Sequence, residues 1–426
     1  MRFTRGRYVT QRRPTDLGAF GGRAAKAGLS YEAFVPATIA DIDVRLSGVA
    51  AADVADAEAA LSRLTHSAVA FPSLEALARR LLRSEAIASS WIEALQVSHR
   101  RLAEAEQGAP GGRYDEARRV VGNVHALDAA VDIGARSGSV TVDDLLSMHG
   151  ALLSTSNVEE DRSRAGEVRD GPVFIGGTNP TNAEYIGPPA GEVIGLLEDL
   201  LDFVNTRRDL SPVVVAAIAH AQFESIHPHH DGNGRVGRCL VHTLLRRETG
   251  SAVLPPLSIA FARPEARYVD GLNAFRRDDL DGWLTVFATA VSFAAHATIG
   301  LAHDVEEHQR SWREQLAEAR ARSGLRPPRA DAAVLAALGI LPDMPAFHTR
   351  DLARRLDRSW RAAQDAIQEL ADVGIVKQLS AGKGNRLYEV PQIFALLDGF
   401  EHQPERLAAL GSPDEHSREA ASGDSA

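Results

Sequence analysis

Twelve consecutive residues, His227 to Arg238, concentrate the side chains of this sequence that are best suited to phosphate chemistry. They read His-Pro-His-His-Asp-Gly-Asn-Gly-Arg-Val-Gly-Arg and combine a base, a carboxylate, three glycines and two arginines. Imidazole has a pKa suited to general-base work near neutral pH, which makes His227 the expected base. Hard oxygen ligands suit Mg²⁺, so Asp231 is the expected metal ligand.

The flanking sequence predicts that this segment is a loop between two helices. Ser211 and Pro212 are typical of a helix start, and the apolar run from Val213 to Ile226 predicts a buried helix. A second helical pattern begins at about Arg235. A loop that leads into a helix N-terminus offers unpaired backbone N–H groups and the positive end of a dipole, so we expect an anion site here.

The glycines and arginines of the segment fit this anion site. Gly232 and Gly234 can adopt positive φ angles and let a phosphate approach the backbone closely. Arg235 and Arg238 lie three residues apart on one helical face, where both guanidinium groups can reach one phosphate chain. The segment therefore predicts a polyphosphate site.

Three other interpretations of the segment remain open. Gly232-x-Gly234-x-x-Gly237 matches a dinucleotide fingerprint, although a helix rather than a strand precedes it. The imidazoles of His220, His227, His229 and His230 could bind zinc, but no cysteine is suitably spaced to join them. The segment could also be a purely structural turn between two core helices.

The segment resembles the signature of the Fic family, His-x-Phe-x-Asp/Glu-Gly-Asn-Gly-Arg-x-x-Arg, at every defined position except His229, where the family usually has Phe. The resemblance implies a Fic-type helical core and transfer of AMP from ATP to a protein hydroxyl. His227 would deprotonate the hydroxyl, Asp231 would hold Mg²⁺, and the anion hole would be formed by Gly232, Asn233 and Gly234. Arg235 and Arg238 would bind the β and γ phosphates. Relatives with a different loop transfer a phosphate or another group.

A second segment, Asp170 to Pro189, reads as two short extended pieces around a turn. A hairpin edge can hold a target peptide by strand addition, which suits modification of one side chain among varied neighbours. Fic proteins carry such a flap before the signature, and Gly166-x-x-Arg169 precedes it here. The expected docking residues are Val173, Phe174, Ile175 and Gly176. The alternative is a solvent-exposed hairpin without a ligand.

A third segment, Ser89 to Glu93, ends an apolar helical pattern. It resembles the Ser/Thr-x-x-x-Glu-Gly/Asn inhibitory helix of the family, except that Ala94 stands where Gly or Asn is usual. The resemblance implies that Glu93 pairs with Arg238 and prevents the γ phosphate from binding productively. Taken alone, Glu93 also fits a solvated charge at a helix end.

The composition limits the kind of protein that carries these segments. The chain has 426 residues, 44% of them hydrophobic, and a net charge of −10, which argues against extensive coating by nucleic acid. The single cysteine, Cys239, cannot form an internal disulfide, so we expect a cytoplasmic protein. The apolar run from Trp283 to Ala295 is too short to span a membrane, and we expect no membrane partner.

Composition changes along the chain predict a mainly α fold with five parts. These are an N-terminal helical region with the inhibitory helix (1–104), the Fic core with its β-hairpin flap (105–300), a linker helix (301–328), a winged-helix domain (329–402) and a disordered tail (403–426). In the fourth part, Arg358, Arg361, Lys383 and Arg386 are the expected DNA contacts. Eight Lys or Arg against six Asp or Glu between 350 and 389 form a weak basic footprint, so protein docking or homodimerisation is an equal alternative.

Two classes of function follow from these observations. The first is an ATP-dependent protein adenylyltransferase that modifies a Ser, Thr or Tyr hydroxyl of a target protein. The second is a DNA-binding regulator whose phosphate loop senses a nucleotide. A pure sensor has no need of a base beside the phosphate, so His227 favours the enzyme.

Overall fold

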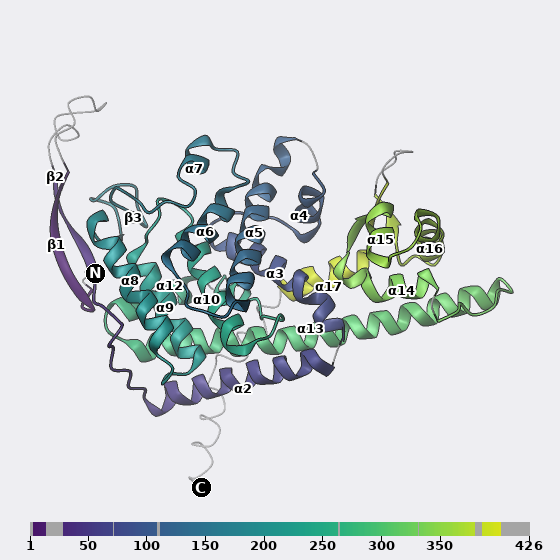
Figure 1. Ribbon diagram of the computed structural model, residues 1–426, viewed down its shortest axis with the longest axis horizontal. Helices are drawn as coiled ribbons and strands as arrows, with labels where there is room; N and C mark the ends of the chain where they lie inside the picture. The colour runs from purple at the N-terminus through teal and green to yellow at the C-terminus, as the bar shows by residue number, and fades with distance from the viewer. Residues whose placement is uncertain are drawn as a thin grey trace, which may run out of the picture.

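The computed structural model describes residues 3–13, 29–70, 72–108, 111–262, 265–330, 332–379 and 386–401. A large helical body and a smaller C-terminal region both pack along one long helix, α13 (Leu280–Arg322), as Figure 1 shows. The mainly α class predicted from the sequence is confirmed.

The helical body precedes and includes the first half of α13. Its other helices are α2 (Gly48–Ala70), α3 (Pro72–Ile92), α4 (His99–Glu106), η1 (Gly112–Tyr114), α5 (Asp115–Ala135), α6 (Val142–Leu153), α7 (Glu159–Ser163), α8 (Ala190–Thr206), α9 (Pro212–Ile226), α10 (Asn233–Thr249), α11 (Ser258–Phe261) and α12 (Glu265–Arg276).

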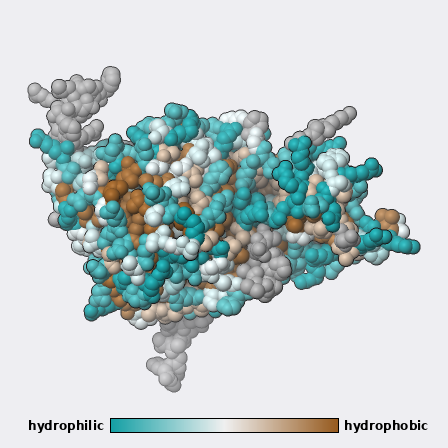
Figure 2. Space-filling view, in the orientation of Figure 1, coloured by the Kyte–Doolittle hydropathy of each residue, from teal (hydrophilic) through white to brown (hydrophobic). Residues whose placement is uncertain are grey.

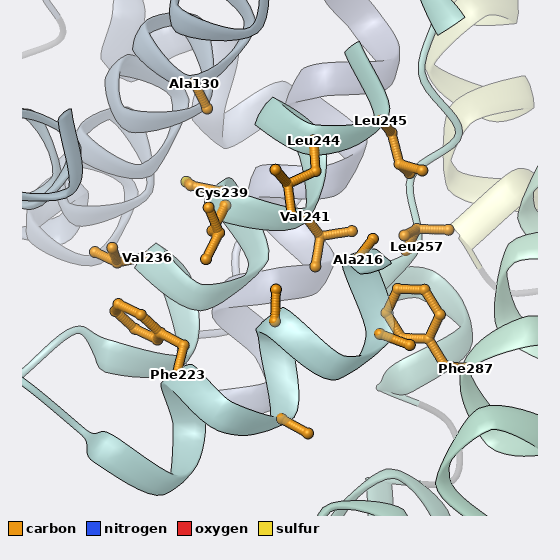
Figure 3. Close-up of a cluster of buried hydrophobic side chains, with 14 of the residues drawn as sticks. Ala130, Ala216, Phe223, Val236, Cys239, Val241, Leu244, Leu245, Leu257 and Phe287 are labelled. Carbon is orange, nitrogen blue, oxygen red and sulfur yellow. The ribbon is translucent and has the colours of Figure 1, made fainter. Parts of the chain in front are cut away.

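Helices α9 and α10 form the centre of the body. The Ser211 hydroxyl accepts a hydrogen bond from the N–H of Val214, and Pro212 occupies the first turn, so α9 starts as predicted. Phe223 of α9 packs beside Val236 and Cys239 of α10 in the apolar cluster of Figure 3. Burial raises the pKa of the Cys239 thiol, which is consistent with a core residue rather than a reactive one.

Two antiparallel hairpins lie at one end of the body (Figure 1). Strands β3 (Phe174–Ile175) and β4 (Tyr185–Ile186) form the predicted flap hairpin. Strands β1 (Gly6–Arg13) and β2 (Leu29–Pro36) were not predicted. The sequence suggested a helical region before residue 104, but this hairpin belongs to it as well. Phe3, Phe34 and Tyr185 form a small apolar cluster that joins the N-terminal hairpin to the flap.

Helix α13 is one continuous helix that includes both the apolar run near Trp283 and the charged run after residue 303. From the sequence, these two runs were expected to belong to different parts of the chain. By length and composition α13 could cross a membrane, but 56% of its most apolar window is buried inside the protein. Trp283, Phe287 and Val291 pack in the main core, while Trp312 and Leu316 pack against the C-terminal region. The helix is therefore a shared core element of both parts.

The C-terminal region combines short helices with a small three-stranded sheet. Its elements are α14 (Ala333–Ile340), η2 (Leu341–Asp343), β5 (Ala346–His348), α15 (Thr349–Leu356), α16 (Trp360–Asp372), β6 (Lys377–Gln378), β7 (Leu387–Glu389) and α17 (Pro391–Glu401). The strand order is β5-β7-β6, and all neighbours are antiparallel. Contacts of α17, η2 and β5 with α3 and α4 hold this region against the body.

Candidate active site

His227 is the cap residue that directly follows α9, and its backbone is left-handed, with φ of 52°. Its ring is 17% exposed and lies 3.8 Å from the carboxylate of Glu224, measured from Nδ1 to Oε2. Burial, together with the nearby Arg276 and Arg169, lowers the pKa of His227 to about 3. The imidazole is therefore neutral near pH 7 and can accept a proton.

The loop after His227 leads directly into α10. Gly232 adopts φ of +80°, and a Cβ on it would lie 2.6 Å from Leu152 Cδ2, so this position requires glycine. The Asn233 side chain clamps the loop, because its Nδ2 donates to His229 O at 2.8 Å and its Oδ1 accepts from His229 N at 2.8 Å. The loop thus leads into the N-terminus of α10, where the sequence predicts an anion cradle formed by backbone N–H groups.

His229, the one departure from the signature that the sequence resembles, anchors the loop on its buried side. Its ring is fully buried and stacks on His149 of α6, with 3.7 Å between ring centroids. Its Nδ1 donates to Glu167 O at 2.7 Å. His149 accepts from the N–H of Gly166 through Nδ1 and donates to Asp231 O through Nε2 at 3.2 Å. The histidine pair therefore replaces an apolar anchor with a packed and hydrogen-bonded one.

Asp231 faces two arginines on the accessible side of the loop, and its side chain is 50% exposed. Arg235 Nη2 lies 3.2 Å from Asp231 Oδ2, and Arg119 Nη2 of α5 lies 4.0 Å from the same oxygen. Arg119 was not predicted, since nothing in the sequence links it to the loop. One exposed carboxylate beside a phosphate cradle fits Mg²⁺, which usually binds through one or two carboxylates and the substrate's phosphates.

Arg238 is buried and bound by the end of α3. Its Nε donates to Ser89 Oγ at 2.7 Å, and its Nη2 donates to Ser89 O at 2.9 Å and to Glu93 Oε1 at 3.0 Å. Burial alone would lower the pKa of Arg238, but Tyr268, Glu93 and Glu224 raise it, so the guanidinium stays charged. The structure thus brings together Ser89, Glu93 and Arg238, which are far apart in the sequence.

The Glu93 carboxylate also lies over the start of α10. A Cβ on Gly234 would be 2.4 Å from Glu93 Oε1, which places the carboxylate directly against the cradle backbone. Ala94, the departure from Gly or Asn, has a left-handed backbone with φ of 60°. An L-residue in this conformation carries a strain of about 1–2 kcal/mol, so glycine or asparagine would fit this turn better.

Arg169 ties the flap to the end of α9 and the loop that follows it. This buried guanidinium donates to four backbone carbonyls, those of His227, Gly171, Pro188 and Ile226. Tyr185 of β4 donates a hydrogen bond to Ser225 O of α9. The base of the flap is therefore held at a fixed position beside His227.

The docking residues predicted in the flap differ in exposure. Val173 is buried, Phe174 and Ile175 are half-buried in β3, and Gly176 is exposed in the turn with φ of +70°. Among the described strands, β3 pairs only with β4, which leaves its second edge free for a peptide strand. Tyr31 of the N-terminal hairpin contacts Phe174, with 6.1 Å between ring centroids. Hydrophobic residues gather on the surface over α8 and the flap (Figure 2).

The two metal and cofactor alternatives lack structural support. A helix leads into the glycine-rich loop, whereas a dinucleotide fingerprint follows a strand. His220 bonds to Tyr268, His229 to Glu167, and His230 to Asp170, so the four histidines do not converge. In the described ranges no three His, Cys, Asp or Glu side chains are grouped to hold a metal.

The predicted DNA contacts of the C-terminal region are exposed where they are described. Arg358 and Arg361 flank the start of α16, beside Trp360, whose side chain is 60% exposed. Arg386 is exposed before β7, and Lys383 lies outside the described residues. The surface over α15 and α16 is mainly hydrophilic (Figure 2).

Comparison with known proteins gives two family matches. Residues 139–245 match the Fic/DOC family, and residues 51–132 match the Fic/DOC family N-terminal model. These ranges contain the signature, the flap and the Ser89–Glu93 segment, and they end before the C-terminal region.

Curated relatives and a solved structure agree with these matches. The chain is 29% identical over 189 residues to "Protein adenylyltransferase fic-1" of Caenorhabditis elegans and 31% identical over 188 residues to "Protein adenylyltransferase Fic" of Culex quinquefasciatus. Each match covers 42% of this chain and 33% or 34% of the relative, so the chain spans about one third of their length. A Fic family protein from Desulfovibrio desulfuricans, 21% identical, shares the fold over 82% of this chain and 97% of its own, with a TM-score of 0.51.

Proposed function

We propose that this chain is a Fic/DOC family protein adenylyltransferase, because residues 51–132 and 139–245 match the two models of that family. The observation that carries the proposal is His227, a neutral and partly exposed imidazole at the mouth of a helix N-terminal anion cradle. In the proposed reaction a hydroxyl oxygen of the target bonds to the α phosphorus of ATP. The bond to the β phosphate breaks, pyrophosphate leaves, and His227 takes the hydroxyl proton.

The other loop residues are assigned by position. The backbone of Gly232, Asn233 and Gly234 binds phosphate oxygens at the start of α10, and Arg235 and Arg238 bind the β and γ phosphates. Asp231 would hold the Mg²⁺ that accompanies ATP, and this ion would offset phosphate charge. The free edge of β3 holds the target backbone, which leaves the Ser, Thr or Tyr side chain to face His227.

This assignment is tested with ATP labelled at either the α or the γ phosphate, in the presence of Mg²⁺. Transfer of AMP labels protein from α-labelled ATP only. Label from γ-labelled ATP alone would instead indicate transfer of a phosphate, the kinase-like alternative within the family. The absence of protein labelling by either nucleotide, together with measurable ATP binding, would favour the nucleotide-sensor alternative.

We further propose that Glu93 inhibits the enzyme by occupying Arg238. A hydrogen bond to a charged group contributes about 1.5–3 kcal/mol, and each 1.4 kcal/mol corresponds to a factor of ten. Glu93→Gly is therefore expected to raise self-modification with ATP and Mg²⁺ by about 10- to 100-fold, measured as initial labelling rate. Glu160→Gly removes an exposed glutamate of α7 and should leave the rate unchanged. Equal or slower labelling in Glu93→Gly would contradict inhibition.

We propose a cytoplasmic location and a target protein with an accessible hydroxyl. The buried thiol of Cys239 cannot form an internal disulfide, which suits a reducing compartment. The target itself is best identified from a lysate with labelled ATP and the Glu93→Gly form.

A second proposed ligand is duplex DNA, bound by the start of α16. The C-terminal region contacts α3 and α4 through α17, η2 and β5. Arg358, Trp360 and Arg361 remain exposed. Fourteen Lys or Arg against ten Asp or Glu between 310 and 389 make this part basic in an otherwise acidic chain. The N-terminal end of such a helix is where base edges are read.

Arg358→Ala combined with Arg361→Ala is expected to weaken binding to duplex DNA by about 10- to 100-fold at low salt. It should also reduce the salt slope of the affinity by about two, because two phosphate contacts are lost. Fluorescence anisotropy measures both quantities, and Arg164→Ala, a distant exposed arginine, is the control. If the parent chain binds no DNA and forms a dimer, the C-terminal region serves protein docking or homodimerisation instead of DNA binding.

A further inference from the structure

Glu224 lies in the last turn of α9, three residues before His227, and the roles assigned above leave it unused. Its side chain is 7% exposed, and its Oε2 lies 3.8 Å from His227 Nδ1. Neither Glu224 Oε1 nor His227 Nδ1 has a hydrogen-bond partner among the described residues. Buried polar atoms without a partner are costly, and the carboxyl group and the imidazole are close enough for a small shift to pair them.

The surrounding sequence makes room for this carboxyl group. Gly237 of α10 faces it, and a Cβ there would lie 2.4 Å from Glu224 Oε1 and 3.0 Å from Phe223 Cδ1. Any other residue at position 237 would push the carboxyl group out of its place. The glycine that suggested a dinucleotide fingerprint in the sequence therefore serves the packing of Glu224 between the two helices.

The ring of His227 is fixed so that its two nitrogens have different surroundings. Arg169 Nε donates to His227 O at 2.7 Å, which holds the left-handed backbone in place. Nδ1 is buried toward Glu224, so the 17% of the side chain that is exposed belongs to the rest of the ring. The opposite edge, which carries Nε2, is the one that a target hydroxyl can approach.

We propose that Glu224 is a positioning residue for His227, forming a carboxylate–imidazole pair behind the base. This proposal rests on the proposed transferase function. Glu224 accepts a hydrogen bond from the Nδ1–H of His227, and Nδ1 keeps its proton. The unprotonated Nε2 then takes the proton of the attacking hydroxyl. The resulting imidazolium is then stabilised by the carboxylate. A shift of about 1 Å from the present 3.8 Å separation gives a hydrogen bond, and such bonds commonly shorten when substrate binds.

The charges around the pair decide the pH at which it works. The pKa of Glu224 is raised to about 7: burial and Glu93 from α3 raise it, while Arg238 from α10 and Arg276 from α12 oppose the rise. Tyr268 of α12 and His220 of α9 also face the carboxyl group. Glu224 is therefore protonated below about pH 7 and ionised above it, so the pair should become a better base as pH rises through 7.

The decisive variant is Glu224→Gln in the full chain, on the Glu93→Gly background. Glutamine has the shape of the protonated acid, so the fold should be kept while the ionisable partner is lost. We expect kcat for AMP transfer to fall by about 10²-fold, with the KM for ATP unchanged within about twofold. We also expect the rise of kcat with pH near 7 to disappear. Glu224→Asp, which keeps an ionisable group, should retain part of this rise.

A merely structural role predicts a different pattern. If Glu224 only supports the fold, the Gln variant would lower kcat and raise KM together, and the rise of kcat near pH 7 would persist. It would also lower the residual rate of a His227→Ala protein, whereas a pair acting through His227 has no further effect there. A kcat within about threefold of the parent, or an unchanged pH profile, overturns the proposal.

A second measurement is independent of transferase activity. Nitrogen-15 NMR of histidine-labelled protein, with His227 identified by its absence in His227→Ala, reports which ring nitrogen carries the proton. We expect an Nδ1–H tautomer whose signals shift with a midpoint near pH 7, and the shift should be absent in Glu224→Gln. An Nε2–H tautomer in the parent above pH 7, where Glu224 is ionised, overturns the pair. If the tautomer is as expected but no AMP is transferred, the transferase proposal fails and the pair stands.

Discussion

Replacement of His227 with alanine is expected to lower transfer of AMP from α-labelled ATP by about 10²- to 10⁴-fold, the range for loss of a general base. His227 is the neutral imidazole at the mouth of the cradle, and its pKa is about 3 because it is buried near two arginines. Alanine removes the proton acceptor while the backbone hydrogen bond from Arg169 remains. The measurement is the initial labelling rate of the Glu93→Gly protein with and without the substitution.

His230→Ala is the matched control for this prediction. His230 belongs to the same loop, its side chain is 27% exposed, and it pairs with the solvent-exposed Asp170 rather than with the cradle. Its loss should change the labelling rate by less than about threefold, since exposed ion pairs contribute little. ATP binding should persist in both variants, because the cradle is formed by backbone. If the His227→Ala protein is labelled as fast as its parent, His227 is not the general base of the reaction.

Much of the active site could be predicted because its chemistry is local in the sequence. Ser211 and Pro212 marked the start of α9, and the glycines marked the loop, so the helix–loop–helix frame was found to within two residues at α10. The flap could be predicted for the same reason, because Gly176 and its neighbours indicate a turn between two short strands. The link between Glu93 and Arg238 came only from resemblance, and the structure supplies its distance.

The parts that sequence reasoning missed depend on contacts between distant segments. His149 reaches Asp231 across 82 residues, and Arg119 reaches the same loop from α5, so no local pattern shows either. The strands β1 and β2 are far apart in the chain for a hairpin, and residues 14–28 between them lie outside the described structure. Glu224 could have been noticed, because it lies one helical turn before His227, but its burial could not.

Replacement of Arg169 with methionine is expected to destabilise the protein and loosen the flap. The guanidinium is 2% exposed and donates to four carbonyls, two at the end of α9 and two at the base of the flap. Each buried carbonyl left unsatisfied costs about 1–3 kcal/mol, and water will reach some of them, so we expect a loss of about 3–4 kcal/mol. Burial lowers the pKa of Arg169 to about 10, which leaves it charged at neutral pH.

Two variants separate the geometry of Arg169 from its charge. Arg169→Lys keeps the charge, but a single ammonium lacks the forked donors needed to span four carbonyls, so it should lose most of the same stability. Arg164→Met, at an exposed arginine paired with Glu160, should cost no more than about 1 kcal/mol. Urea unfolding measures the free energies, and hydrogen exchange should show faster opening around residues 171–188 and 226–231 in both Arg169 variants. Native exchange rates there in Arg169→Lys would mean that charge, not the four-carbonyl clamp, holds the flap beside the catalytic loop.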